Sequence, residues 1–382
     1  MTYHPHQNTT TPSKSESFRF WWKIGWISFG GPAAQIALLH DELVKKKKWI
    51  SYPDFQECLN FCLFLPGPEA QQLATYLGYK IHGFWGGVFT GLLFLFPGLL
   101  CLFGISFAYV TWGNLPFVLY TLTGMQWAIL AFILQSLINV AKKIANQKSS
   151  NSNEAIQSTK EPLNYLRTIA NRFIFFVAVY LFIYFILKIY DQGILIQLFE
   201  LFSKTAFITF GGAYAVIPYV SYEMVYNLGL LEEKQIFDGL GLGESTPGPL
   251  VLVLPFFGFV AGYLQSSSLL MGSFCFFISA LATFLPSFLL IFCLAPLFEK
   301  IRKKKLYSFF NKLVTPIVLV MLAVLIYRFG ENLWWNSGYS LLGKALLFFW
   351  IGLLAFGFYR WKWEILPVVL LSGIIGVVVF GA

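Results

Sequence analysis

Long apolar runs without a charged residue alternate with short polar segments along the chain. The longest of these runs are Phe84 to Val110, Leu115 to Val140 and Ser245 to Phe298. A helix crosses the hydrocarbon core of a bilayer with about 20 apolar residues, so the last run is long enough for two crossings. The pattern therefore predicts an all-α polytopic membrane protein.

The composition agrees with this prediction. Of the 382 residues, 57% are hydrophobic and 12% are charged, and the mean hydropathy is +0.66. A soluble domain carries about 25% charged residues. The N-terminal residues 1–17 are polar, and no small-residue cleavage site follows the first apolar run, so we expect no cleavable signal peptide.

The net charge of +9 is concentrated in short blocks of Lys and Arg between the apolar runs. Cytoplasmic loops of membrane proteins are enriched in these residues. We therefore expect a multi-pass protein of the cytoplasmic membrane, with the lipid bilayer and not a nucleic acid as its partner. The blocks are Lys45 to Lys48, Lys142 with Lys143, Arg302 to Lys305, and Arg360 with Lys362.

The chain contains an internal duplication. Phe29-Gly30-Gly31 recurs as Phe210-Gly211-Gly212, and Pro66-Gly67-Pro68 recurs as Pro247-Gly248-Pro249, both at an offset of 181 positions. Chance can produce one such motif pair, but hardly two in register. The same offset relates five further pairs: Lys23 and Lys204, Ile27 and Ile208, Ala34 and Ala215, Ile36 and Ile217, and Glu42 and Glu223.

This duplication suggests a division of the chain into five parts. A polar linker, residues 146–172, separates the halves and begins with the loop-forming sequence NQKSSNSNEAIQSTKE. The other parts are a polar N-terminal tail (1–17), a first repeat (18–145), a connecting transmembrane helix (173–193) and a second repeat (194–382). An odd number of crossings between the repeats would invert the second one.

The charges of two equivalent loops indicate this inversion. The loop after the first glycine pair runs into four lysines, Lys45 to Lys48, whereas its counterpart, residues 221–234, carries three Glu and one Lys. The first loop is therefore expected to be cytoplasmic and the second external. Repeats of opposite topology are typical of secondary transporters.

The number of crossings indicates re-entrant segments. Three apolar runs, 54–79, 84–110 and 115–140, separate two lysine blocks that should both be cytoplasmic, so an even number of them must cross. Runs 18–39 and 54–79 carry their glycine or proline motif near the midpoint, and reading each as a re-entrant hairpin satisfies the count. Applied to both repeats, this predicts seven full spans and four re-entrant elements; about eleven plain crossings is the alternative.

Helices broken inside a membrane suit the binding of an anion. Irregular backbone is tolerated at that depth only where protein or a water-filled cavity covers it. Pro favours the first turn of a new helix, and Gly permits positive φ and close approach. The N-terminus of the new helix presents free N–H groups and a partial positive charge. The alternative is that these glycines and prolines are packing sites and kinks.

The ordered motifs resemble the chromate ion transporter family. The resemblance rests on Ser28 to Pro32, His40 to Leu43, the basic run ending at Trp49, and Leu65 to Pro68. The second half, with residues 210–212 and 246–249, is similar to the second domain of the family's long form. The resemblance to this family implies that the protein exports chromate or moves sulfate, which is nearly isosteric with chromate. Ala213 stands where the first half has Pro32, and Tyr222 where it has Asp41, which suggests an asymmetric site.

The candidate substrate-binding residues lie at or near the four motifs. The two equivalent lysines could supply positive charge, or extend to the headgroups instead. Hydroxyls and amides could donate hydrogen bonds to an oxyanion. The candidates are Lys23, Ser28, Gly30, Gly31, Gly67, Gln71, Gln72, Lys204, Thr209, Gly211, Gly212, Ser245, Thr246 and Gly248.

Two carboxylates beside the proline motifs, Glu69 and Glu244, are candidates for proton coupling, because an ionisable group in a membrane segment is a functional candidate by default. Their alternative role is a hydrogen bond that stabilises the hairpin, or a place on the wall of a water-filled vestibule. We expect no cofactor and no metal: Cys58 and Cys62 are one helical turn apart, but no His stands near enough to complete a set.

The predicted function is a secondary transporter of a small oxyanion, and two alternatives remain open. One is an intramembrane enzyme acting on a lipid or an isoprenoid phosphate, but the chain has four His and no HExxH or Asp-rich motif, so we predict no enzyme. The other is an anion channel with similar hairpins. The sequence leaves the oligomeric state open, a homodimer included.

Overall fold

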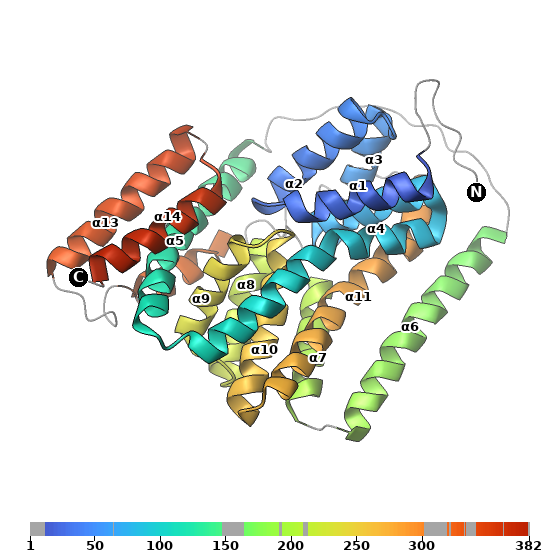
Figure 1. The fold of residues 1–382 in the computed structure, drawn as a ribbon. Coiled ribbons are helices and arrows are strands. Elements are labelled where there is room, and N and C mark those ends of the chain that lie inside the picture. The colour runs from blue at the N-terminus through green and yellow to red at the C-terminus, as the bar shows by residue number, and fades with distance from the viewer. Residues whose placement is uncertain are drawn as a thin grey trace.

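The computed structural model describes residues 12–63, 65–146, 164–190, 193–208, 213–301, 319–320, 322–331, 333, 341–361 and 363–380. Throughout these ranges the regular elements are helices, and no strand is found there (Figure 1). Four of the described helices are long and apolar enough to cross a membrane: α4 (Glu69–Trp112), α5 (Pro116–Asn146), α6 (Asn164–Tyr190) and α11 (Leu269–Ile301). The prediction of an all-α polytopic membrane protein is confirmed.

The first repeat begins with helices that are too short to span. Helices α1 (Lys14–Ile27), α2 (Gly31–His40) and α3 (Tyr52–Cys62) have 14, 10 and 11 residues, whereas a crossing takes about 20. Helix α4 is broken at Gly83, whose φ of 72° is not helical, so its residues 69–82 form a fourth short helix and residues 84–112 form a span. The discontinuous helices predicted from the motifs are therefore present.

The second repeat has the same series of elements. Helices α7 (Ile194–Ile208), α8 (Ala213–Tyr222), α9 (Glu233–Glu244) and α10 (Val253–Ser266) have 15, 10, 12 and 14 residues. A 3-10 turn, η4 (Leu250–Leu252), precedes α10, and Ser267 with φ 54° separates α10 from the long α11. A π-helical turn follows the second short helix in both repeats, η1 (Asp41–Lys46) and η3 (Glu223–Asn227).

The two sets of short helices approach each other from opposite ends of the molecule. In Figure 1, α1 to α3 lie in the upper part and α8 to α10 in the lower part. Helices α4 and α11 pack against each other between them, and each repeat packs its first short helix on its own long helix, α1 on α4 and α7 on α11. This arrangement is that of two inverted repeats around a central contact.

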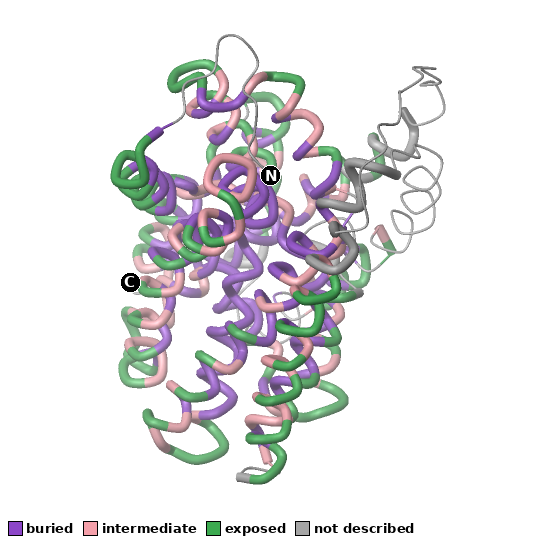
Figure 2. Tube along the Cα trace, turned by 90° about the vertical axis from the view of Figure 1, so that its right-hand side faces the viewer, coloured by how far each residue is buried: buried purple, intermediate pink, exposed green. Residues whose placement is uncertain are grey.

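The remaining helices surround this centre. Helix α5 packs against α9, α13 (Leu341–Phe356) and α14 (Ile365–Phe380), while η5 (Gly357–Trp361) follows α13. Buried residues concentrate along the middle of the molecule, and exposed residues cover the outer helices (Figure 2). On α6 the apolar Phe182 and Ile189 are 66% and 75% exposed. An exposed apolar face of this kind fits contact with lipid.

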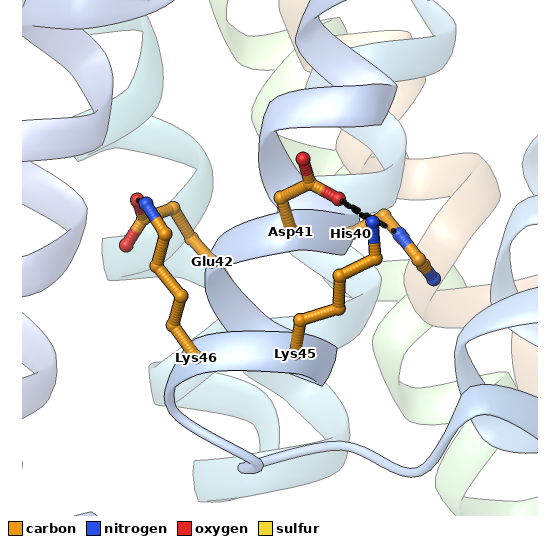
Figure 3. A network of polar contacts seen from close by, with 5 residues as sticks. All are labelled: His40, Asp41, Glu42, Lys45 and Lys46. Atoms are coloured by element: carbon orange, nitrogen blue, oxygen red, sulfur yellow. Dashed lines mark hydrogen bonds and ion pairs between the residues drawn. The ribbon is translucent and has the colours of Figure 1, made fainter.

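The loop after α2 is held by ion pairs between neighbouring helical turns (Figure 3). Lys45 pairs with Asp41 at 2.7 Å, and Lys46 pairs with Glu42. The hydrogen bond from Lys45 is the main reason why the pKa of Asp41 lies below its ordinary value. Asp41, Lys45 and Lys46 are exposed and Glu42 is partly buried, which fits the aqueous end of a hairpin.

Which side of the membrane each loop faces stays a prediction, and labelling can test it. A single cysteine at Lys46 should be protected from an impermeant thiol reagent in intact cells, and one at Lys234 should be labelled, because the inverted repeats place them on opposite sides. The unmodified protein supplies the background, since four of its five cysteines are buried. Labelling of both positions, or of neither, would contradict the inverted topology.

Candidate functional site

Within the described residues, the glycine motif of the first repeat and both proline motifs form breaks between helices. Gly30 and Gly31 separate α1 from α2 with φ of 89° and 78°. Gly67 precedes α4 with φ 122°, and Gly248 precedes η4 with φ 100°. L-residues with side chains rarely adopt such angles, which is why glycine stands at these turns. Each break is followed at once by a helix N-terminus with its unpaired N–H groups.

The glycine motif of the first repeat contacts the proline motif of the second. The N–H of Gly248 donates to the carbonyl of Ser28 at 2.7 Å. The Nε2 of Gln35 on α2 donates to the carbonyls of both residues, at 2.7 Å for Gly248 and 3.1 Å for Ser28. All three residues are buried. The tips of two hairpins from different repeats are therefore joined by two hydrogen bonds, and the bond from Gln35 to Ser28 holds the glutamine in place within the first repeat.

Each Pro-Gly-Pro turn also abuts the long helix of the other repeat. A Cβ on Gly67 would lie 2.8 Å from the Oγ of Ser287 on α11, and a Cβ on Gly98 of α4 would collide with the carbonyl of Pro247. Gly98 follows Pro97 on α4, and Ser287 follows Pro286 on α11, so each contact involves the residue after a proline inside a long helix. The contact is thus repeated with approximate two-fold symmetry.

Several buried polar atoms around these tips have no hydrogen-bond partner in the described protein. They are the Oε1 atoms of Gln35, Gln71 and Gln72 and the Oγ of Ser287. The Nε2 of Gln72 donates to the carbonyl of Pro66 at 2.7 Å, and that of Gln71 donates to Thr75 at 3.0 Å. Buried polar groups are nearly always bonded to protein, water or ligand, so these atoms are free to bind water or a ligand beside the tips.

The hydroxyl candidates use their protons for local hydrogen bonds. Ser28, Ser245 and Thr246 each donate to the carbonyl three residues earlier, those of Gly25, Leu242 and Gly243. Their oxygens can still accept a bond, but donation to an anion would require each hydroxyl to rotate. The N–H groups in the first turn of a helix need no such rotation, because the helix itself leaves them without a partner.

The charged candidates lie at the margin of this site. Lys23 on α1 and Lys204 on α7 are exposed, and the ammonium of Lys204 lies 5.6 Å above the ring of Tyr219. Glu69 is half-buried in the first turn of α4, where the helix dipole favours a negative charge. Glu244 is buried at the end of α9 and lines a small apolar cavity with Ile129 and other residues. Their roles stay predictions.

Some predicted residues lie outside the described ranges, and the motifs did not point to every residue of the site. Thr209, Gly211 and Gly212 fall outside the described part of the chain. Gln35 was missed because its repeat equivalent is the apolar Val216, so a comparison of the two halves does not select it. The sequence did offer one signal for Gln35, because it is a polar residue among the mostly apolar residues of α2.

These observations define a helical membrane protein with two repeats whose broken helices meet at a polar centre. The family model for the chromate transporter matches residues 15–195 and 196–377. The chain belongs to the chromate transporter family. No solved structure matches it.

Curated relatives from several bacteria carry related names. The chain is 28% identical to the "Probable chromate transport protein" of Synechococcus elongatus over 77% of its own length and 79% of the relative. It is 26% identical to the "Chromate transport protein" of Cupriavidus metallidurans, covering 74% of each chain. Identity to the Pseudomonas aeruginosa protein of that name is 30%, over 63% of this chain and 65% of the relative.

Proposed function

We propose that this protein is a secondary transporter that moves chromate, and sulfate as a near isostere, across the cytoplasmic membrane, with efflux as the working direction. Family membership supports the class of substrate. The observation that carries the mechanism is the hydrogen-bonded contact between the hairpin tip at Ser28 and the tip at Gly248, which belong to different repeats. In transporters with inverted repeats, substrate binds where such broken helices meet.

The chemistry of this centre suits a small divalent oxyanion. The N-termini of α2, α4 and η4 supply N–H groups and partial positive charge without a mobile cation. A tetrahedral oxyanion accepts several hydrogen bonds at once, so it can be held by several helix ends together. The lysines on α1 and α7 would then guide the anion toward the tips or anchor the helices at the headgroups.

A change in the contact between the tips would give access to each side in turn. The two hydrogen bonds that Gly248 makes with Ser28 and Gln35 join the repeats in the present arrangement. Movement of one repeat against the other around a fixed site is the general mode of alternating access in such folds. Bound anion would shift the equilibrium by its different affinity for the two arrangements.

Flux of labelled chromate and sulfate into proteoliposomes tests this function. We expect saturable chromate flux, competition by sulfate, and accumulation against a concentration gradient when a pH step is imposed. Liposomes without protein are the control. Flux that only follows the gradient would favour a channel, and release of phosphate from lipid phosphates would favour an enzyme.

A further inference from the structure

A buried carboxylate that the motifs did not point to connects the two repeats. Asp238 lies on α9 of the second repeat and is 1% exposed. Its Oδ2 accepts a hydrogen bond from the hydroxyl of Tyr109 on α4 at 2.8 Å, and its Oδ1 accepts one from the Nε2 of Gln126 on α5 at 2.7 Å. Both donors come from the first repeat. Asp238 is six residues before the tip-flanking Glu244, roughly 9 Å along a helix.

The surroundings of Asp238 supply hydrogen bonds but no neutralising partner. Among the described residues no Lys or Arg forms an ion pair with it. A carboxylate at membrane depth is costly, and ionisable groups there are usually paired or serve transport. The groups that act on it directly are Tyr109 of α4, neutral Gln126 of α5 and Lys234 in the first turn of α9. Glu232, the N-cap of α9, acts on Tyr109, and α9 also carries Glu233 and Glu244. Tyr263 is the one titratable residue of α10, and η4 and α14 have none.

The hydrogen bonds of this site can be made with or without a proton. When the carboxylate is ionised, Tyr109 and Gln126 both donate to it. When it is protonated, its O–H can donate to the oxygen of Tyr109, since a phenol both donates and accepts, while Gln126 still donates to the other oxygen. An ion pair with a cation would lose its charge partner on protonation. This site keeps its partners in both states.

The repeat supplies an internal comparison. Glu57 on α3 is the equivalent of Asp238 at the offset of 181 positions. Glu57 is half-buried, whereas Asp238 is buried. The two repeats therefore differ at this position in how far the acid is shielded from water.

We propose that Asp238 is the proton-binding site that couples a pH gradient to movement of the anion. One proton from the aqueous phase converts the carboxylate to the neutral acid in one arrangement of the repeats, and the same proton returns to water on the other side in the second arrangement. Because Asp238 joins α9 to α4 and α5, its protonation changes the interaction between the repeats themselves. This inference rests on the proposed transport of an anion.

The substitution Asp238→Asn separates coupling from structure. Asparagine has the shape of the neutral acid and can bond both neighbours, so a purely structural role predicts a normal protein. A proton-binding role predicts that chromate self-exchange at equal pH stays within about twofold of wild type, while accumulation driven by a pH step is lost. A one-unit step can sustain about a tenfold accumulation per coupled proton. The membrane potential is held at zero with potassium and valinomycin during both measurements.

Each outcome decides the inference. Wild-type accumulation by Asp238→Asn under a pH step would overturn it, as would loss of self-exchange in a variant that inserts normally. Glu57→Gln is the matched control and should keep the coupling. If the wild-type protein shows saturable chromate exchange that sulfate inhibits but does not respond to pH, the role of Asp238 fails and chromate transport stands without coupling to protons; if it carries no anion at all, the proposed function fails as well.

A second variant covers the case in which Asp238→Asn does not fold. Tyr109→Phe removes one donor and keeps the carboxyl group, so transport should still respond to the pH step. The pH of half-maximal flux should move upward, because a lost donor disfavours the ionised form relative to the neutral acid. An unchanged pH profile in Tyr109→Phe would count against the proposal.

Discussion

Valine at Gly67 or at Gly248 should abolish anion transport while the protein still inserts into the membrane. Both glycines have φ above 90°, and a side chain in such a conformation costs about 1–3 kcal/mol. A Cβ at Gly67 would lie 2.5 Å from the Nε2 of Gln72, and one at Gly248 would lie 2.5 Å from Cδ1 of Leu252. The turn would have to open, and the helix N-termini that follow it would leave the site. Flux into proteoliposomes is the measurement, with insertion checked by size-exclusion chromatography.

Two other glycines serve as matched controls for this prediction. Gly83 has φ 72°, but a Cβ added there would meet nothing within 4 Å, so Gly83→Val reports the cost of the backbone angle without crowding. At Gly104, within the long helix α4, nothing lies within 4 Å either and φ is not positive, so Gly104→Val should transport normally. Wild-type flux in both tip variants would show that the tips do not line the site.

Replacement of Gln35 by leucine should reduce transport roughly ten- to hundredfold, since it removes the side chain that joins the two hairpin tips. The carbonyl of Gly248 would lose the bond from Gln35, whereas the carbonyl of Ser28 would keep the bond from the Gly248 N–H. A buried carbonyl without a donor costs about 1–3 kcal/mol. Apparent affinity for chromate, measured by calorimetry on purified protein, should fall together with the flux.

The matched control is another Gln→Leu change that leaves the tips intact. The side chain of Gln135 on α5 donates along its own helix, to Asn139 at 3.3 Å, and does not reach the tips. Gln135→Leu should therefore keep wild-type affinity and flux. If Gln35→Leu behaves in the same way as this control, the bridge between Ser28 and Gly248 has no part in binding or transport.

The pairing of tips explains why two motifs occur in each repeat. Within one repeat the glycine motif and the proline motif form separate turns, and the described contacts show that the glycine motif at residues 28–31 meets the proline motif of the other repeat. Likewise Gly67 lies against Ser287 and Pro247 lies against Gly98. Neither repeat alone contains a complete centre, so duplication and inversion are needed together.

The sequence by itself determined the class of protein, the duplication and the positions of the breaks. These are local properties. Backbone groups inside a bilayer must be hydrogen-bonded within the chain, so the length of an apolar run predicts a membrane helix. Gly30, Gly67 and Gly248 are glycines because their backbone has positive φ. Repeat spacing could be read directly because both halves keep the same chain length between their motifs.

Only the tertiary structure decided which residues meet. Gln35 and Gly248 are 213 positions apart, and Asp238 is 129 positions from Tyr109. Comparison of the two halves selects residues that the repeats share, whereas Gln35 has an apolar equivalent in Val216 and Asp238 differs from Glu57 in burial. Side chains that join the repeats need to match their partner and not their symmetry equivalent, so their identity follows from how the two halves pack and not from the motif that each half carries.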